Sequence, residues 1–341
     1  MYSIFDLIVF NLAILILCFL FSRTHKFSFL KIFVLTIIIS SYFGFRSLNV
    51  GPDTIIYYAR FVNSSDDFEV GFTLLNRLIL TVFGNDHRVY FTLINFVMIM
   101  NLLIASRIIV KYPIYIYTAW ILVSLPYSIL MQINIIRQGL ALSFFVLGIS
   151  FFLNKQSFFG TILSLLSISL HTSIIIYIIS YFLTYFLSVK KDKRVILIFI
   201  FFLFSITNIP LDFIQSIKLP YIDTRIFIIT NLNDSLSIFV KISFYIFLFF
   251  IIEYLMIDKG LYKQQISLFS FIIMSSAILI FQNELFSVRY LLALDFLIPI
   301  LLLSKATFYK NKHFFFASSF LVFLVFLISI YSLAFASNFN F

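Results

Sequence analysis

Long apolar runs separated by short polar stretches follow one another along the whole chain of 341 residues. A bilayer core is about 30 Å thick, so a helix of roughly 20 apolar residues spans it. The pattern predicts an all-α polytopic membrane protein that forms a single transmembrane domain over residues 1–341. About 12 transmembrane helices are expected, at 2–22, 27–44, 89–110, 113–131, 138–154, 156–170, 172–189, 195–209, 239–257, 266–282, 290–304 and 313–336.

The apolar stretch at residues 70–84 differs from the others in length and content. It has 15 residues, and Asn76 and Arg77 lie in its middle. A helix this short does not cross the hydrocarbon core, and a charge that faces lipid is costly. We therefore interpret the stretch as a short re-entrant or interfacial helix near 70–84, on the outer side. The alternative is a short, tilted thirteenth span, which would invert the topology of every later loop.

Composition agrees with a membrane protein, because 62% of the residues are hydrophobic and only 11% are charged. A soluble domain cannot cover so much apolar surface with so few charges. The net charge of +10 would suggest a nucleic-acid partner in a soluble protein, but here the basic residues gather in alternate loops. By the positive-inside rule, these loops are cytoplasmic and both termini lie on the opposite, outer side of the membrane. No nucleic-acid partner is expected.

Two predicted extracytoplasmic loops are long, at about 45–88 and 210–238, whereas the other connections are short. Long loops on a rigid scaffold commonly carry ligand-binding groups. Five arginines lie at or near this outer face, and guanidinium groups suit bidentate binding of phosphate. An anionic ligand carried by a lipid is the simplest explanation for these residues, which are Arg46, Arg60, Arg137, Arg225 and Arg289.

The first local motif is FRSLNVGPDTIIYY, at residues 45–58. Gly51 and Pro52 predict a tight turn, and Asp53 and Thr54 are expected to cap a helix that begins near Ile55. A capped interfacial helix with an aromatic belt would account for most of this motif. It does not account for Arg46, which has no topological reason to be there.

Two later motifs place polar groups in apolar surroundings. In NIIRQGLA, Arg137 and Gln138 interrupt an apolar stretch, and burying them is costly without a partner or a wet cavity. In SLHTS, His171 lies between two short apolar helices, where it is either a hydrogen-bonded hinge or a general base. Arg137 alone would also fit an arginine that only reaches lipid phosphate. No pair of histidines shares a helix face, so we expect no catalytic metal and no cofactor, and at most a weak cation site at Asp66 and Asp67.

Together these motifs read R-x4-GPDT-x2-Y, N-x2-RQ-x2-A and H-x-S, in that order. They resemble the EpsG family of polysaccharide biosynthesis proteins, which is grouped with the Wzy-type polymerases of O-antigens and capsules. The resemblance covers roughly residues 40–190, and the last third is similar only in hydropathy. Pro52 departs from the pattern, because the family more often has threonine there.

The resemblance implies a GT-C-like, metal-independent glycosyltransferase of the inner membrane. Such an enzyme transfers a growing glycan from undecaprenyl diphosphate onto the terminal sugar of a new lipid-linked repeat unit, on the periplasmic face. Its partners would be lipid-linked donor and acceptor glycans, membrane lipid and a chain-length regulator. Carried onto this chain, the catalytic residues are His171 and Asp53, with His171 favoured as the base. The substrate-binding residues are Arg46, Thr54, Tyr57, Arg60, Arg137, Gln138, Arg225 and Arg289.

Two other functions stay open at this point. A lipid-linked oligosaccharide flippase would bind the same lipid, but it should carry charges deep in several helices. In this chain Asp295 and Glu253 are the main residues of that kind. An O-antigen ligase differs from a polymerase mainly in its acceptor.

Overall fold

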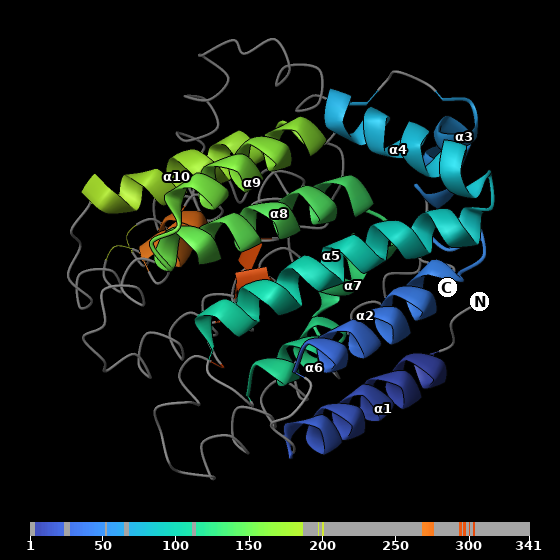
Figure 1. Cartoon of the computed structure of the whole chain (residues 1–341), viewed down its shortest axis with the longest axis horizontal. Coiled ribbons are helices and arrows are strands. Elements are labelled where there is room, and N and C mark those ends of the chain that lie inside the picture. Colours follow the sequence, from blue (N-terminus) through green and yellow to red (C-terminus); the bar gives the residue numbers. More distant parts are fainter. Residues whose placement is uncertain are drawn as a thin grey trace. The chain divides into compact units, whose positions relative to one another are not determined.

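The computed structural model describes residues 4–23, 28–51, 53–64, 68–110, 114–186 and 268–275, together with positions 197, 200, 293, 294, 296, 297, 300 and 303. Every regular element in these residues is a helix (Figure 1). The predicted all-α class is therefore confirmed for this part of the chain. The helices are α1 (Ile4–Ser22), α2 (Ser28–Gly44), α3 (Thr54–Val62), α4 (Val70–Phe83), α5 (His87–Ile109), η1 (Ile114–Ile116), α6 (Tyr117–Leu122), α7 (Pro126–Ile133), α8 (Ile136–Leu153), α9 (Ser157–Leu170) and α10 (Ile174–Phe186).

Among the described residues, three helices are long and apolar enough to cross a membrane: Phe5–Ser22 of α1, α5 and α8. Four shorter apolar helices are α2, α4, α9 and residues Ile174–Thr184 of α10. The predicted helix near 70–84 is present as α4, and its position relative to the membrane stays a prediction. The count of about 12 spans and the GT-C-like arrangement also stay predictions. Most of the last five predicted spans lie outside the described residues, although the helical residues 268–275 fall within the expected span 266–282.

The predicted continuous span at 113–131 is wrong. The structure divides it into η1, α6 and the start of α7, with a break at residues 123–125. Leu125 is extended, with φ −86° and ψ 133°, and Pro126 opens α7. A proline has no main-chain N–H and disfavours the helical conformation in the residue before it, so the chain leaves the helix at this point.

The described residues belong to two compact units, and the predicted single domain stays a prediction. One unit comprises Met1–Ile175 together with Ile298–Phe341, and the other extends from Ile176 to Leu297. In the second unit the rings of Tyr181 and Phe269 pack edge to face, with their centroids 5.9 Å apart. The first unit contains every contact discussed below.

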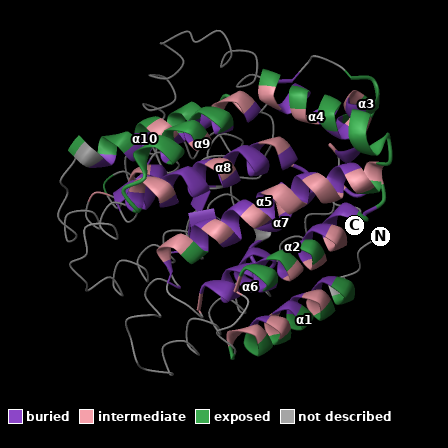
Figure 2. Ribbon diagram, viewed as in Figure 1, coloured by how far each residue is buried: buried purple, intermediate pink, exposed green. Residues whose placement is uncertain are grey.

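Within the first unit, α8 packs between α9 and α5, and α5 also packs against α2 (Figure 1). The apolar window of α8 is 78% buried, whereas that of α1 is only 22% buried. Figure 2 shows this contrast between the inner helix and the peripheral one. Apolar side chains on an exposed helix are stable in lipid, so α8 belongs to the core of this unit and the exposed face of α1 suits contact with lipid.

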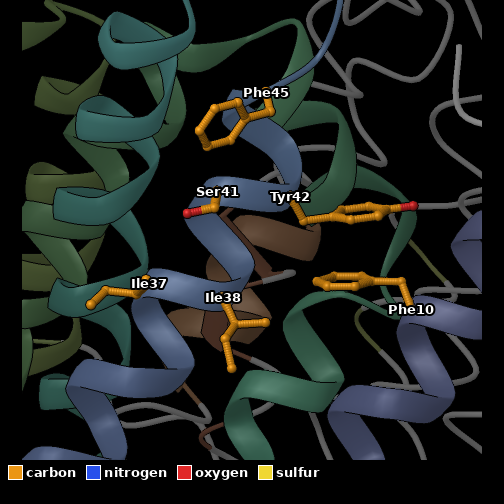
Figure 3. A pocket seen from close by; sticks show the side chains of 6 residues that line it. All are labelled: Phe10, Ile37, Ile38, Ser41, Tyr42 and Phe45. Carbon is orange, nitrogen blue, oxygen red and sulfur yellow. The ribbon is translucent and has the colours of Figure 1, made fainter.

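A shallow apolar hollow of about 620 Å³ lies where α1 and α2 meet (Figure 3). One wall is formed by the stacked rings of Phe10 and Tyr42, with centroids 3.6 Å apart. Of the described residues that line it, only Ser41 and Tyr42 carry a hydroxyl group and none is charged. The lining residues are Phe10, Ile37, Ile38, Ser41, Tyr42 and Phe45.

The second break in the chain, between α7 and α8, is held by a buried arginine. Arg46 follows the end of α2 and is 2% exposed. Its Nη1 donates to the carbonyls of Phe43 at 2.7 Å and Gln132 at 3.2 Å, and its Nη2 donates to that of Ile133 at 2.9 Å. The guanidinium also lies 3.9 Å from the ring centroid of Phe91. The end of α2 is thereby fastened to the carbonyls at the end of α7.

Two asparagines support the same broken segment. Asn95 of α5 donates to the Gln132 carbonyl at 3.2 Å. Asn11 of α1 donates to the Val123 carbonyl at 3.2 Å and accepts a bond from the Trp120 indole at 2.9 Å. A carbonyl away from water needs such a donor, since helix breaks leave it without its usual partner.

We predict that Arg46→Lys lowers the thermal unfolding midpoint of the protein in detergent. One ammonium group cannot replace a planar fork that bonds three carbonyls, and each buried carbonyl left without a donor costs about 1–3 kcal/mol. Arg60→Lys is the matched control, because Arg60 is only partly buried and is expected to leave the midpoint nearly unchanged. Equal unfolding midpoints for wild type and Arg46→Lys would show that the hydrogen bonds from Arg46 to the three carbonyls contribute no stability.

Candidate functional site

The first motif folds as a turn followed by α3. Gly51 has φ 82°, a left-handed conformation that favours glycine and fits the predicted tight turn. The helix begins at Thr54, close to the expected start near Ile55. The predicted cap by the Asp53 side chain is wrong, since that side chain makes no capping bond. Instead, the Asp53 main-chain N–H donates to Asn134 Oδ1 at 2.9 Å, which joins the first motif to the second.

Three predicted substrate-binding residues of these motifs face protein. The buried Thr54 hydroxyl donates to the carbonyls of Val50 and Ile133. Tyr57 is 8% exposed and packs near the ring of Phe68, and Gln138 is 2% exposed. Thr54, Tyr57 and Gln138 are thus buried within the protein in this structure, and their roles in substrate binding stay predictions.

The second and third motifs meet at a carboxylate. Glu69 Oε2 accepts from Arg137 Nη1 at 2.6 Å, and Glu69 Oε1 lies 2.7 Å from His171 Nδ1. The main-chain N–H of Thr172 also donates to Oε1, at 3.3 Å. The three side chains of Arg137, Glu69 and His171 are between 17% and 23% exposed, so the cluster is accessible without being fully solvated.

The contacts of Glu69 determine its charge. Partial burial opposes ionisation, but the hydrogen bond from His171 and the positive charge of Arg137 outweigh it and lower the pKa of Glu69 from 4.5 to about 2. An ionised carboxylate only accepts hydrogen bonds. The proton in the His171 contact therefore lies on Nδ1. Among the described residues, Nε2 of His171 has no hydrogen-bond partner.

Two guanidinium groups lie against the ring of Phe68. The guanidinium carbon of Arg137 lies 4.4 Å from its ring centroid, and that of Arg60 lies 4.9 Å from it. An aromatic face attracts cations and holds them in place without using their N–H donors. Arg60 and Arg137, 77 positions apart in the printed sequence, are thus brought to one ring.

The helix ends explain why these residues converge. Arg137 is the second residue of α8, and Glu69 immediately precedes α4. His171 follows the last residue of α9 in an extended conformation, with φ −160° and ψ 118°. Gly71 allows the start of α4 to approach the end of α9, since a Cβ there would lie 2.3 Å from Ser169 Oγ and 2.8 Å from the Ser169 carbonyl oxygen.

Of the predicted site residues, the structure brings together Arg60, Arg137 and His171. Arg46 faces main-chain carbonyls, and its predicted role in substrate binding is not tested by this geometry. Arg225, Arg289, the loop at 210–238 and the weak cation site at Asp66 and Asp67 lie outside the described residues.

Glu69 is the residue that the sequence analysis missed as part of a site. One signal was present: it is the acid that directly precedes the short apolar segment at 70–84. An acid at that boundary is also typical of a helix N-terminus, where it needs no distant partner. The sequence therefore gave no reason to pair it with Arg137 or His171.

The cluster suits two chemical tasks. The partly exposed guanidinium groups of Arg60 and Arg137 are suited to charge-assisted hydrogen bonds with an anion such as a phosphate ester. The imidazole has one nitrogen bonded to a carboxylate and the other available as a proton acceptor, which is the arrangement of an oriented general base.

We predict that Gly71→Ala destabilises the protein by about 1–3 kcal/mol, because the added methyl group forces α4 away from α9. The thermal unfolding midpoint in detergent measures this. Ser169→Ala alone is expected to have little effect. The double variant should remain destabilised, since main-chain atoms of Ser169 still lie 2.8 and 2.9 Å from the new Cβ. If the double variant recovered the wild-type unfolding midpoint, main-chain atoms of Ser169 would not be what limits the approach of α4 to α9.

Acid should remove the contribution of Glu69 to stability. Its pKa is 4.5 when unperturbed and about 2 in the folded protein, so the unfolded chain binds the proton first as pH falls. The stability advantage of wild type over Glu69→Gln is therefore expected to be constant above about pH 4.5 and to shrink as pH falls towards 2. The unfolding midpoints of both proteins across this pH range measure this advantage. An advantage that is unchanged near pH 2 would contradict the lowered pKa of Glu69.

Comparison with known proteins adds one match. The model of the EpsG family matches residues 29–341, which include all three motifs and the last third of the chain. No curated protein and no solved structure matches the chain. The family match thus extends well beyond residues 40–190, where the motifs lie. By its motifs, its apolar helices and this match, the chain belongs to the EpsG family, whose members are membrane proteins of polysaccharide biosynthesis.

Proposed function

We propose that this protein polymerises undecaprenyl-diphosphate-linked oligosaccharide repeat units into O-antigen or capsular polysaccharide. The reaction would occur on the periplasmic face of the inner membrane. The observation that supports this most is the meeting of Arg137 and His171 at Glu69. A phosphate-binding group and a base, from motifs 34 positions apart, lie on opposite oxygens of one carboxylate.

Arg60 and Arg137 are the donor side of the proposed site. Both guanidinium carbons lie within 5 Å of the Phe68 centroid, so the two groups are at most about 10 Å apart. A pair of guanidinium groups can bind the two phosphates of a diphosphate through planar, charge-assisted hydrogen bonds. The same contacts stabilise the negative charge of the diphosphate as it leaves the anomeric carbon.

His171 is the acceptor side. Its Nε2 takes the proton of a sugar hydroxyl while the hydroxyl oxygen forms a bond to the anomeric carbon of the donor glycan. The bond from that carbon to the diphosphate oxygen breaks in the same reaction, and the electron pair leaves with the undecaprenyl diphosphate. The glycan is thereby transferred and grows by one repeat unit.

The surroundings of the site suit a substrate carried by a lipid. Next to the cluster, α3 and α4 expose apolar side chains to their surroundings (Figure 2). Such a surface is stable in the outer leaflet and unstable in water. A diphosphate anchored by a polyprenyl chain would reach the arginines from this leaflet. The exposed apolar residues are Ile55, Ile56, Val62, Val70, Leu74, Leu78, Val82 and Phe83.

The positions of the charged groups favour an enzyme over a flippase. Arg137 opens α8, His171 follows α9 and Glu69 precedes α4, so each lies at a helix end and none at a helix centre. A flippase would need polar groups along the whole translocation path. The lipopolysaccharide ladder of a deletion strain distinguishes the classes. We expect a single-unit band, whereas loss of all glycan from the core would indicate a ligase and accumulation of unflipped lipid-linked units a flippase.

Purified variants test the assigned roles. With lipid-linked repeat units as substrate, His171→Ala should lower the polymerisation rate by roughly 10²- to 10⁴-fold, the usual contribution of a general base. Arg137→Lys should lower it by roughly 5- to 150-fold, because an ammonium replaces a planar fork by a single donor. Long glycan chains should be lost in both cases, while the protein stays folded.

Two substitutions serve as matched controls. Arg88 is the second residue of α5, as Arg137 is of α8, and it is exposed. His87 lies outside the cluster. Arg88→Lys and His87→Ala should therefore polymerise at nearly the wild-type rate. Normal polymerisation by His171→Ala would remove His171 as the base and make Asp53 the leading candidate.

A further inference from the structure

Glu69 stands at the start of α4, yet its side chain does not cap that helix. Acidic residues at this position usually accept a bond from the first main-chain N–H groups of their own helix. Asp86 does so at the start of α5, where its carboxylate accepts from the N–H of Arg88 at 2.7 Å. The Glu69 carboxylate instead contacts two residues that follow it by 68 and 102 positions.

The two oxygens of Glu69 are divided between these contacts. Oε2 accepts from Arg137, and Oε1 accepts from His171 and from the Thr172 main chain. The close approach of Gly71 to Ser169 fixes the start of α4 against the end of α9, so the carboxylate has little freedom to leave either partner. This arrangement aligns the imidazole and the guanidinium with each other.

The contact with Oε1 also selects the form of the imidazole. A neutral histidine carries its proton on one of two nitrogens, and the partner of one nitrogen decides which. A carboxylate at Nδ1 requires the proton there, so Nε2 keeps its lone pair. Without the carboxylate, the ring is free to rotate and to carry its proton on Nε2. A protonated Nε2 has no lone pair available and cannot accept the proton of the sugar hydroxyl.

We propose that Glu69 is a positioning residue of this site, which holds His171 in the tautomer and orientation of a base and keeps Arg137 beside it. The inference rests on the proposed function, in which His171 accepts the proton of the acceptor hydroxyl. It adds a residue that acts through His171 and does not itself touch the substrate.

Nuclear magnetic resonance of the imidazole nitrogens tests the tautomer without any reaction. The chain has four histidines, and the His171 signals are those lost in His171→Ala protein. At alkaline pH in detergent, we expect the wild type to carry its proton on Nδ1. Glu69→Ala should shift the population towards protonated Nε2, and Asp86→Asn, the matched control, should leave the spectrum of His171 unchanged. An unaltered tautomer in Glu69→Ala would overturn the proposal.

Polymerisation kinetics test the consequence. Glu69→Ala should lower kcat by at least about tenfold, and by no more than the roughly 10²- to 10⁴-fold expected for the base itself. Glu69→Gln keeps one acceptor oxygen and should recover part of the loss. In a His171→Ala background, Glu69→Ala should cause a much smaller further fall, because of the two residues that Glu69 holds only Arg137 remains.

The outcomes separate this proposal from the function on which it rests. If His171→Ala abolishes polymerisation but Glu69→Ala polymerises normally, Glu69 has no positioning role and the proposed function stands. If Glu69→Ala lowers the rate equally with and without His171, Glu69 is only a structural link between helices. If His171→Ala itself is fully active, the proposed function loses its base whatever Glu69 does.

Discussion

The arrangement of this protein depends on main-chain carbonyls that have lost their helical partners inside an apolar bundle. The chain leaves the helix twice between α6 and α8, and a broken helix at membrane depth is stable only if other groups satisfy its polar atoms. Arg46 and Asn95 supply donors to the carbonyls at the end of α7. The positive charge of Arg46 therefore serves the main chain, and its burial is offset by those hydrogen bonds and by the Phe91 ring.

The hydrogen bonds at the end of α7 also determine the position of the candidate site. Residues 132–134 bind Arg46, Thr54 and the Asp53 main chain, and α8 begins two residues later with Arg137 as its second residue. The direction in which Arg137 leaves the bundle is thus set by contacts with the first motif. The third motif is joined separately, through Glu69. These contacts connect the end of α2 with the end of α9, and the cluster of Arg137, Glu69 and His171 lies at the α9 end.

The all-α class and most of the described helices could be predicted from the sequence, because the length of an apolar run alone indicates a spanning helix. The sequence predicted one continuous span at 113–131, whereas the structure has a break before Pro126. Hydropathy depends on the side chains and does not reflect the main-chain N–H that proline lacks. The sequence identified Arg137 and His171 as polar residues in apolar surroundings. It could not show that Arg46 binds carbonyls, because a ligand-binding arginine and a structural one have the same signature. Glu69 was missed for a related reason, as its partners are distant in the chain and only the approach of α4 to α9 brings them together.

The order of the donors along the chain has a consequence for biogenesis. Asn11, Arg46 and Asn95 all precede the carbonyls of Val123, Gln132 and Ile133 that they satisfy. A polytopic chain is synthesised from its N-terminus, so α1, α2 and α5 are made before the broken segment leaves the ribosome. The segment with the most exposed main chain thus enters the membrane when its partners have already been synthesised. A circular permutation that placed α6–α8 first would present the same carbonyls to lipid without donors, and insertion would fail although every contact of the finished fold could still form.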